Sequence, residues 1–285
     1  MQLNRIGKWN ITVLETGTFR LDGGAMMGSV PKVLWEKTNP PDLYNRISLA
    51  MRCILLDDGN NRVLIESGIG DKCGDKFKKM FEIKQHKHAL SNTLSKYGYT
   101  NENITHIILT HLHFDHSGGC TEFDENGNII PSFPNAKYYV SQENWDAALN
   151  PNPKDKASYL SENYMCLKEK KVLELVPNDF TILNDISTYV VNGHTFGQQL
   201  VKINSDNKTL VFCSDLIPLR SHIRLPWIMG YDLNASLSLE EKELFLDEAA
   251  DKGWILFLYH DPDTVAVRIK KEEGKYKVID ELRRK

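Results

Sequence analysis

The sequence has no long apolar run and no excess of positive charge. No apolar run approaches the ~20 residues that a membrane-spanning helix needs, and residues 1–8 lack the apolar core of a signal peptide. The formal net charge of −3 gives no electrostatic basis for binding nucleic acid or an anionic membrane. These absences predict a cytoplasmic protein that has neither nucleic acid nor membrane as a partner.

Cysteine is scarce and irregularly spaced. The five cysteines are odd in number and form no Cys-x-x-Cys pair. This pattern indicates reduced thiols in a cytosolic protein rather than a disulfide framework. Cys120, which directly follows the His- and Asp-containing residues 110–119, is expected to be a small buried side chain without a role in chemistry.

A glycine-rich loop at Leu21–Gly28 lacks the Gly-Lys-Ser/Thr ending of a phosphate-binding loop. Its glycines and its methionines, expected to be exposed, predict a mobile flap near the mouth of a site. Met26, Met27, Phe114 and Trp227 are all expected at that mouth. Such side chains favour acyl chains or aryl groups over highly charged substrates.

Hydrophobic spacing predicts strands and helices in mixed order along the whole chain. Strands are predicted over residues 11–19, 46–57, 62–67 and 104–109. Helices are predicted over residues 75–96 and 156–169, from a Ser141 cap to about Leu149, and from Ser238 to Gly253. No repeat and no linker-like composition interrupts this order, which predicts one α/β domain over residues 1–285.

Potential metal ligands are concentrated in the stretch Thr110-His-Leu-His-Phe-Asp-His-Ser-Gly-Gly119, directly after the predicted strand at 104–109. His111 and His113 alternate, so both can project to one side of the chain. Asp115 and His116 follow directly and can turn toward a second point nearby. Four potential ligands in this arrangement predict two adjacent metals rather than one closed tetrahedral site.

This stretch resembles the His-x-His-x-Asp-His motif of the metallo-β-lactamase-fold hydrolases, and the resemblance extends from about residue 10 to about residue 270. The family pattern implies three further ligands at strand ends. His194 lies in a Gly-His-Thr-Phe-Gly turn, Asp215 ends an apolar strand, and His260 ends another. In Glu66-Ser67-Gly68 a glutamate stands where the family usually carries an aspartate that supports the metal site.

By position in the family motif, the ligands divide into two sets that share one carboxylate. One metal takes His111, His113 and His194, the other takes Asp115, His116 and His260, and Asp215 bridges them. Imidazole and carboxylate ligands without thiolate suit zinc, with iron, manganese and cobalt left open. The resemblance also implies a four-layer αββα sandwich, with two central mixed β-sheets and the site at one edge.

The resemblance further implies a metal-dependent hydrolase with a small-molecule substrate. A hydroxide bridging the two metals would attack an ester, lactone or related bond, and Asp115 would pass a proton to the leaving alkoxide. His113 favours hydrolysis, since oxygen-reducing diiron relatives tend to carry glutamate there. The chain is most similar to quorum-quenching acyl-homoserine lactonases and to methyl parathion hydrolase-like enzymes.

Several alternatives stay open at this point. They are a phosphotriesterase or aryl esterase, a thioester hydrolase of the same fold, and a metal-binding member without catalytic activity. Pro218 occupies the position where well-known lactonases carry a tyrosine that holds the substrate carbonyl. Tyr231 and His222 lie in the same segment as candidates for that role. A homodimer is also left open.

Overall fold

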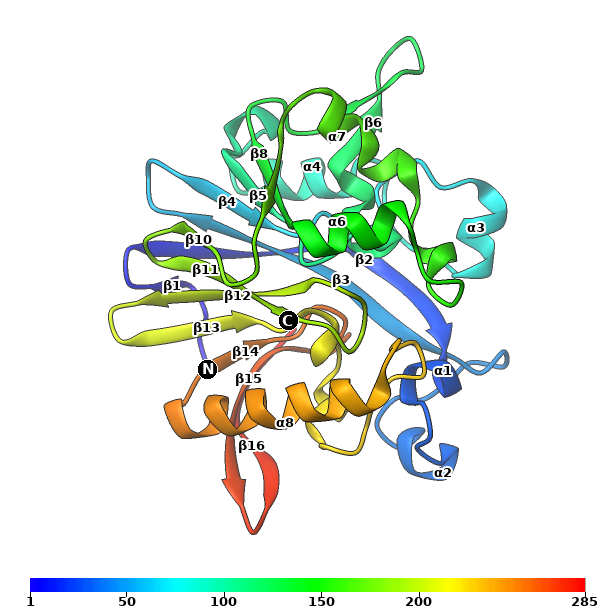
Figure 1. The fold of residues 1–285 in the computed structure, drawn as a ribbon, viewed down its shortest axis with the longest axis vertical. Coiled ribbons are helices and arrows are strands. Elements are labelled where there is room, and N and C mark those ends of the chain that lie inside the picture. The colour runs from blue at the N-terminus through cyan, green and yellow to red at the C-terminus, as the bar shows by residue number, and fades with distance from the viewer. Residues whose placement is uncertain (285) are drawn as a thin grey trace.

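The computed structural model describes residues 1–284. Two seven-stranded sheets and a short hairpin contain its strands (Figure 1). The first sheet has the spatial order β1 (Arg5–Ile6), β2 (Trp9–Asp22), β3 (Arg46–Asp57), β4 (Arg62–Ile65), β5 (His106–Ile108), β8 (Lys137–Ser141), β9 (Leu173–Val176). The second has the order β10 (Thr181–Leu183), β11 (Ile186–Val191), β12 (Gln198–Ser205), β13 (Lys208–Phe212), β14 (Ile255–Phe257), β15 (Thr264–Glu272), β16 (Lys275–Arg283). The hairpin pairs β6 (Thr121–Phe123) with β7 (Ile129–Pro131).

Both sheets are mixed. In the first, β1 to β4 pair antiparallel and β4, β5, β8 and β9 pair parallel. In the second, only β13 and β14 pair parallel. β14 is apolar and buried throughout, and both isoleucines of β5 are buried, as expected for parallel strands covered on both faces.

The helices are mostly short. They are α1 (Gly23–Met27), α2 (Lys32–Trp35), α3 (Asp75–Met80), α4 (Ala89–Ser95), α5 (Phe114–Ser117), α6 (Gln142–Leu149), α7 (Met165–Glu169) and α8 (Ala235–Lys252). Single 3₁₀ turns lie at residues 101–103, 118–120, 156–158, 161–163, 214–216 and 220–223. Within residues 1–284, no helix combines the length and apolar character that a membrane crossing requires.

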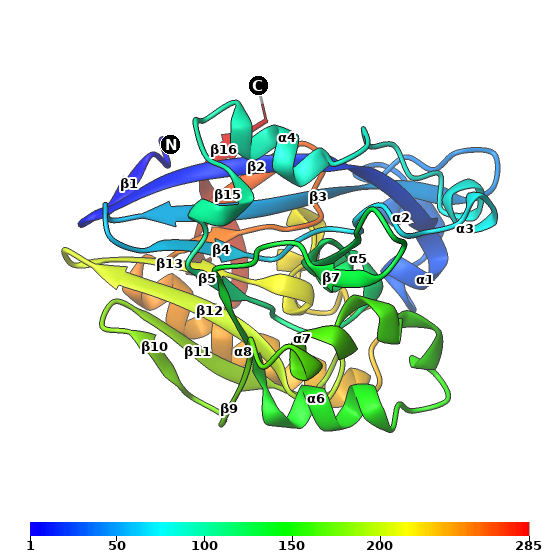
Figure 2. The ribbon, with the colours of Figure 1, turned by 90° about the horizontal axis from the view of Figure 1, so that it is seen from above.

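The alternation of side chains along the strands produces four layers. On β3, Ile54 and Leu56 face the core between the sheets, while Cys53 and Leu55 face α4, α6 and α7. On the second sheet, Val211 points away from the other sheet and packs against α8. Figure 2 shows α4 outside β2, and Figure 1 shows α8 across the second sheet. The predicted αββα sandwich is confirmed.

Two helix predictions are wrong in their interiors. The predicted helix over 75–96 is broken between α3 and α4, where Lys84 forms a β-bridge with Thr18. The predicted helix over 156–169 is two 3₁₀ turns followed by α7. The helix capped by Ser141 is confirmed, since its hydroxyl accepts from the Asn144 amide.

The prediction of exposed methionines in a flap is also wrong. Residues 23–27 form α1, and Met26 and Met27 are buried in the core between the sheets. The Met26 carbonyl accepts from the His222 ring, and the Ala25 carbonyl accepts from the Gly230 amide. These bonds join α1 to the segment that follows Asp215.

Arg52 links the two sheets from a fully buried position on β3. Its Nη1 donates to the carbonyls of Leu258, Asp261 and Thr264, on both sides of His260. Its Nε donates to Glu15 at 2.6 Å. One guanidinium group therefore determines the path of the turn that carries His260.

Arg52→Met is expected to lower the free energy of unfolding by about 3–5 kcal/mol, because it leaves the Glu15 charge and three carbonyls without their donor. Urea unfolding of the whole chain measures this loss. Arg5→Met is the control, since Arg5 is exposed and donates to one carbonyl. It is expected to stay within about 0.5 kcal/mol of the parent protein, and an equal loss in both variants would contradict the assigned role of Arg52.

Candidate metal centre

The loops that follow four strands meet at one edge of the two sheets. Residues 109–117 follow β5, His194 lies between β11 and β12, Asp215 follows β13, and His260 follows β14. All seven residues expected to be ligands are buried and lie in one continuous group. Three of these loops follow β5, β13 and β14, each of which pairs parallel with a neighbouring strand.

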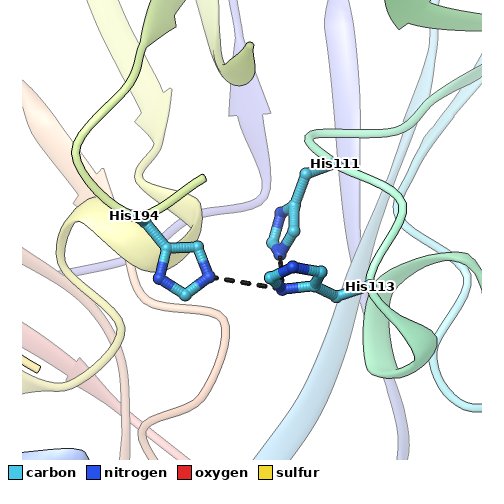
Figure 3. Close-up of side chains that lie close together, drawn as sticks. All are labelled: His111, His113 and His194. Carbon is cyan, nitrogen blue, oxygen red and sulfur yellow. Dashed lines mark hydrogen bonds between the residues drawn. The ribbon is translucent and has the colours of Figure 1, made fainter. Parts of the chain in front are cut away.

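His111, His113 and His194 point their ring nitrogens at one another (Figure 3). The His111 Nε2 lies 3.0 Å from the His113 Nδ1, and the His194 Nε2 lies 3.3 Å from the same atom. Three imidazoles from two separate loops thus converge on one point. This donor set is one that binds a divalent transition metal.

A second group lies beside the first. The His260 Nε2 is 3.5 Å from Asp115 Oδ2, and the His116 Nε2 is 3.8 Å from the same oxygen. Asp215 lies between the groups, with Oδ1 at 3.3 Å from the His260 Nε2 and Oδ2 at 3.4 Å from the His194 Nε2. Its two oxygens therefore face different sets of histidines.

The residues of the centre differ in exposure. His111 and His116 have no exposed surface, whereas His113, His194, Asp115 and Asp215 are each 6–8% exposed. A molecule from solvent therefore meets these four side chains before the two inner histidines.

In His116, His260 and His194, the ring nitrogen that faces away from the centre has an oxygen partner. The His116 Nδ1 lies 3.1 Å from Glu66 Oε2, and the His260 Nδ1 lies 3.0 Å from the Ala50 carbonyl. The His194 Nδ1 lies 2.9 Å from Asp232 Oδ1. Each acceptor places the ring proton on Nδ1, which leaves the Nε2 lone pair directed at the centre.

The backbone also holds the ligand loops close to their neighbours. A Cβ on Gly118 would overlap the Ile69 carbonyl, and a Cβ on Gly193 would overlap the backbone of Ser238. Glu241 on α8 accepts from the amides of Asn192 and Gly193, directly before His194. The close approaches at Gly118 and Gly193 leave no room for a side chain, so both positions require glycine.

The electrostatics of the centre favour a cation. Burial alone would raise the pKa of Asp215, but the adjacent His116 and His260 hold that pKa well below its usual range. Burial would lower the pKa of His116, but Asp215, Asp115 and Glu66 raise it well above its usual range. The buried carboxylates thus create a negative potential that a bound cation would neutralise.

The polar atoms directed at the centre include some without hydrogen bonds. Among residues 1–284, the His116 Nε2 and Asp215 Oδ1 are buried without a hydrogen-bond partner. Unpaired buried polar atoms are rare, and they require compensation by a ligand. Together with the convergence of imidazoles and carboxylates, they make the clusters consistent with a binuclear metal site.

The sequence indicated the role of some residues around the centre but not of others. Glu66 is fully buried and contacts His116, as its place in the Glu-Ser-Gly segment implied. Asp232 and Asp155 lie in irregular segments whose sequences gave no signal for them. His222 has its Nε2 bonded to the Met26 carbonyl and serves packing, whereas Tyr231 is half-buried with no hydrogen bond among the described residues.

Comparison with known proteins gives similarity over most of the chain. The model of the Metallo-beta-lactamase superfamily matches residues 52–260. A probable metallo-hydrolase of Mycobacterium tuberculosis is 23% identical in an alignment of 284 residues, covering 84% of this chain and 85% of the relative. An N-acyl homoserine lactonase of Bacillus cereus is 24% identical over 180 residues, covering 59% of this chain and 63% of the lactonase.

Solved structures match along nearly the full length. A probable metal-dependent hydrolase from Staphylococcus aureus has a TM-score of 0.90 and 29% sequence identity, covering 98% of both chains. AidC, a dizinc quorum-quenching lactonase in complex with a homoserine product, has a TM-score of 0.80 and 19% identity, covering 98% of this chain and 96% of its own. At that identity the second match supports the fold alone.

Glu66→Gln is expected to destabilise the metal-free protein by about 1–3 kcal/mol. The carboxylate accepts from the Thr110 amide and from His116, and an amide presents only one acceptor to these two donors. Urea unfolding after chelator treatment measures the change. Glu125→Gln, at an exposed position, provides the control; equal midpoints for both variants would contradict the role of Glu66.

Proposed function

Since the chain belongs to the metallo-beta-lactamase superfamily and is a metal-dependent hydrolase, we propose that it hydrolyses an ester or lactone bond in a small apolar substrate. The observation that carries the proposal is the position of Asp215. Its two carboxylate oxygens face two separate groups of imidazoles. One buried carboxylate between two donor sets is the arrangement that a two-metal hydrolytic site requires.

The proposed ligands divide as the side chains do. One metal would be held by His111, His113 and His194 and the second by Asp115, His116 and His260, with Asp215 between the two groups. Zinc suits these nitrogen and oxygen donors best, and iron, manganese and cobalt are the alternatives. When bound, such a pair polarises a carbonyl oxygen and lowers the pKa of water toward neutrality.

The chain's own groups then orient the substrate and move the proton. Asp115 is one of the slightly exposed residues of the centre, and the Tyr259 hydroxyl donates to its backbone carbonyl at 2.5 Å. This bond fixes Asp115 where it can hand a proton to the leaving oxygen of an ester or lactone. The Tyr231 hydroxyl, which has no partner among residues 1–284, is available to bind the substrate carbonyl.

Apolar side chains surround Phe114, the residue before Asp115. The Phe114 ring lies 5.0 Å from Phe77 and 5.4 Å from Phe81, measured between ring centroids. The two outer rings are half-buried and pack against the central core. Such a surface suits an acyl chain or an aryl group. The lactonase relatives, whose structures hold homoserine products, support a lactone as the first substrate to test.

Asp215→Ala is expected to remove both metals, because it deletes the one carboxylate that faces both groups. Metal analysis of protein purified without chelator should give about two equivalents for the parent chain and close to none for the variant. His86→Ala, at an exposed position far from any ligand cluster in residues 1–284, should retain both. Full metal content in the Asp215 variant would rule out the bridge.

Purified protein is expected to hydrolyse acyl-homoserine lactones or aryl esters faster than organophosphates or thioesters. The reason is that the aromatic rings beside the centre suit acyl chains and aryl groups, and that lactonases are among the similar proteins. A panel of these four substrate classes, each measured with and without chelator, tests the proposal. Activity that survives complete metal removal would contradict the mechanism. Faster hydrolysis of the organophosphate would indicate a phosphotriester, and not a lactone, as the preferred substrate.

A further inference from the structure

His113 differs from the other histidines of the centre in the partner of its outer nitrogen. Its Nδ1 faces His111 and His194, so its Nε2 faces outward. That Nε2 is buried and has no hydrogen bond among residues 1–284. The nearest acid is Asp155, whose Oδ2 lies 3.9 Å away. This distance is longer than a hydrogen bond but short enough for the carboxylate charge to act on the ring.

Asp155 is buried within an otherwise exposed segment. Residues 152–154, 156 and 157 are exposed, but Asp155 itself is only 7% exposed and directs its carboxylate inward. Its Oδ1 has no hydrogen-bond partner in the described part of the chain. A buried carboxylate with a free oxygen beside a buried imidazole nitrogen costs free energy unless the two are coupled.

A directed series of hydrogen bonds holds this carboxylate in place. The Asn144 amide group donates to the Tyr159 hydroxyl at 3.3 Å, and the Thr195 hydroxyl donates to Asp155 Oδ2 at 3.0 Å. Because the single Thr195 proton is used on Asp155, the Tyr159 hydroxyl donates to Thr195, at 2.7 Å. Every donor in the series points toward Asp155, which therefore acts only as an acceptor.

The same series joins both loops of the first group. Asn144 Oδ1 accepts from the Leu112 amide at 2.9 Å, and its amide nitrogen donates to the Phe196 carbonyl at 2.7 Å. The Tyr159 ring packs edge-on against His113, with centroids 4.7 Å apart. One buried asparagine on α6 therefore fixes the loop before His113 and the loop after His194 relative to each other.

We propose that Asp155, oriented by Thr195 and Tyr159, is a positioning residue for His113. The inference rests on the proposed function, in which His113 binds metal through Nδ1. A lone pair on Nδ1 places the ring proton on Nε2, the atom that faces Asp155. The carboxylate then stabilises this tautomer and the ring orientation, and it makes Nδ1 a stronger donor.

The experiment measures zinc dissociation constants by competition with a chromophoric chelator, using the full-length chain. Asp155→Asn keeps the side-chain volume and removes the charge, and Thr195→Val removes the hydroxyl that orients it. Both are expected to weaken zinc binding by about 10–100-fold. Thr195→Ser keeps the hydroxyl and should restore the parent affinity. Asp146→Asn, an exposed acid on α6, is the matched control and should change nothing.

Two further readouts separate positioning from a purely structural role. The visible absorption of the cobalt-substituted protein should change in Asp155→Asn, because the geometry around His113 changes. Urea unfolding of the metal-free variants reports stability alone. A zinc affinity of Asp155→Asn equal to that of the parent chain, with or without a loss of stability, would overturn the inference. A parent chain that binds no metal would instead overturn the proposed function.

Discussion

The burial of the Asp215 carboxylate between two groups of histidines is the constraint on which the rest of the centre depends. A charge in this position is costly unless it is compensated from both sides. In the protein alone, His116 and His260 supply that compensation and lower the pKa of Asp215. Two cations between the same groups would balance the carboxylates more fully, so the fold prepares the charge distribution that the metals need.

The positions of the ligand loops depend on hydrogen bonds to the backbone more than on apolar side-chain packing. The Ala50 amide and carbonyl bond to the His260 carbonyl and ring, while Arg52 holds the carbonyls on either side of the same turn. Gly118 lies against the Ile69 carbonyl with no room for a side chain. Loops are usually the mobile part of a domain, and these contacts hold the ligand loops against neighbouring backbone.

The sandwich and three of the seven candidate ligands were expected from the resemblance to the metallo-β-lactamase fold, whereas the strands and the other four candidates followed from local patterns. Strand alternation has a period of two residues, and the His-x-His-x-Asp-His spacing lies in one loop. The break between α3 and α4 could not be seen, because Lys84 pairs with a distant strand. Asp155 and Asp232 are single acids in irregular segments, and only tertiary contacts reveal that they are buried beside histidines.

The two groups of the centre are supported by different parts of the fold. His116 is held by Glu66, the residue after β4, and His260 is held by the carbonyl of Ala50, which lies on β3 of the first sheet. His113 and His194 instead face Asp155 and Asp232, which lie in the irregular segments 150–163 and 216–234. Lys154 joins these segments by donating to the Asp232 carbonyl. Segment 150–163 therefore supports the first group alone, whereas segment 216–234 contacts both groups, since the His260 amide also donates to the Pro218 carbonyl.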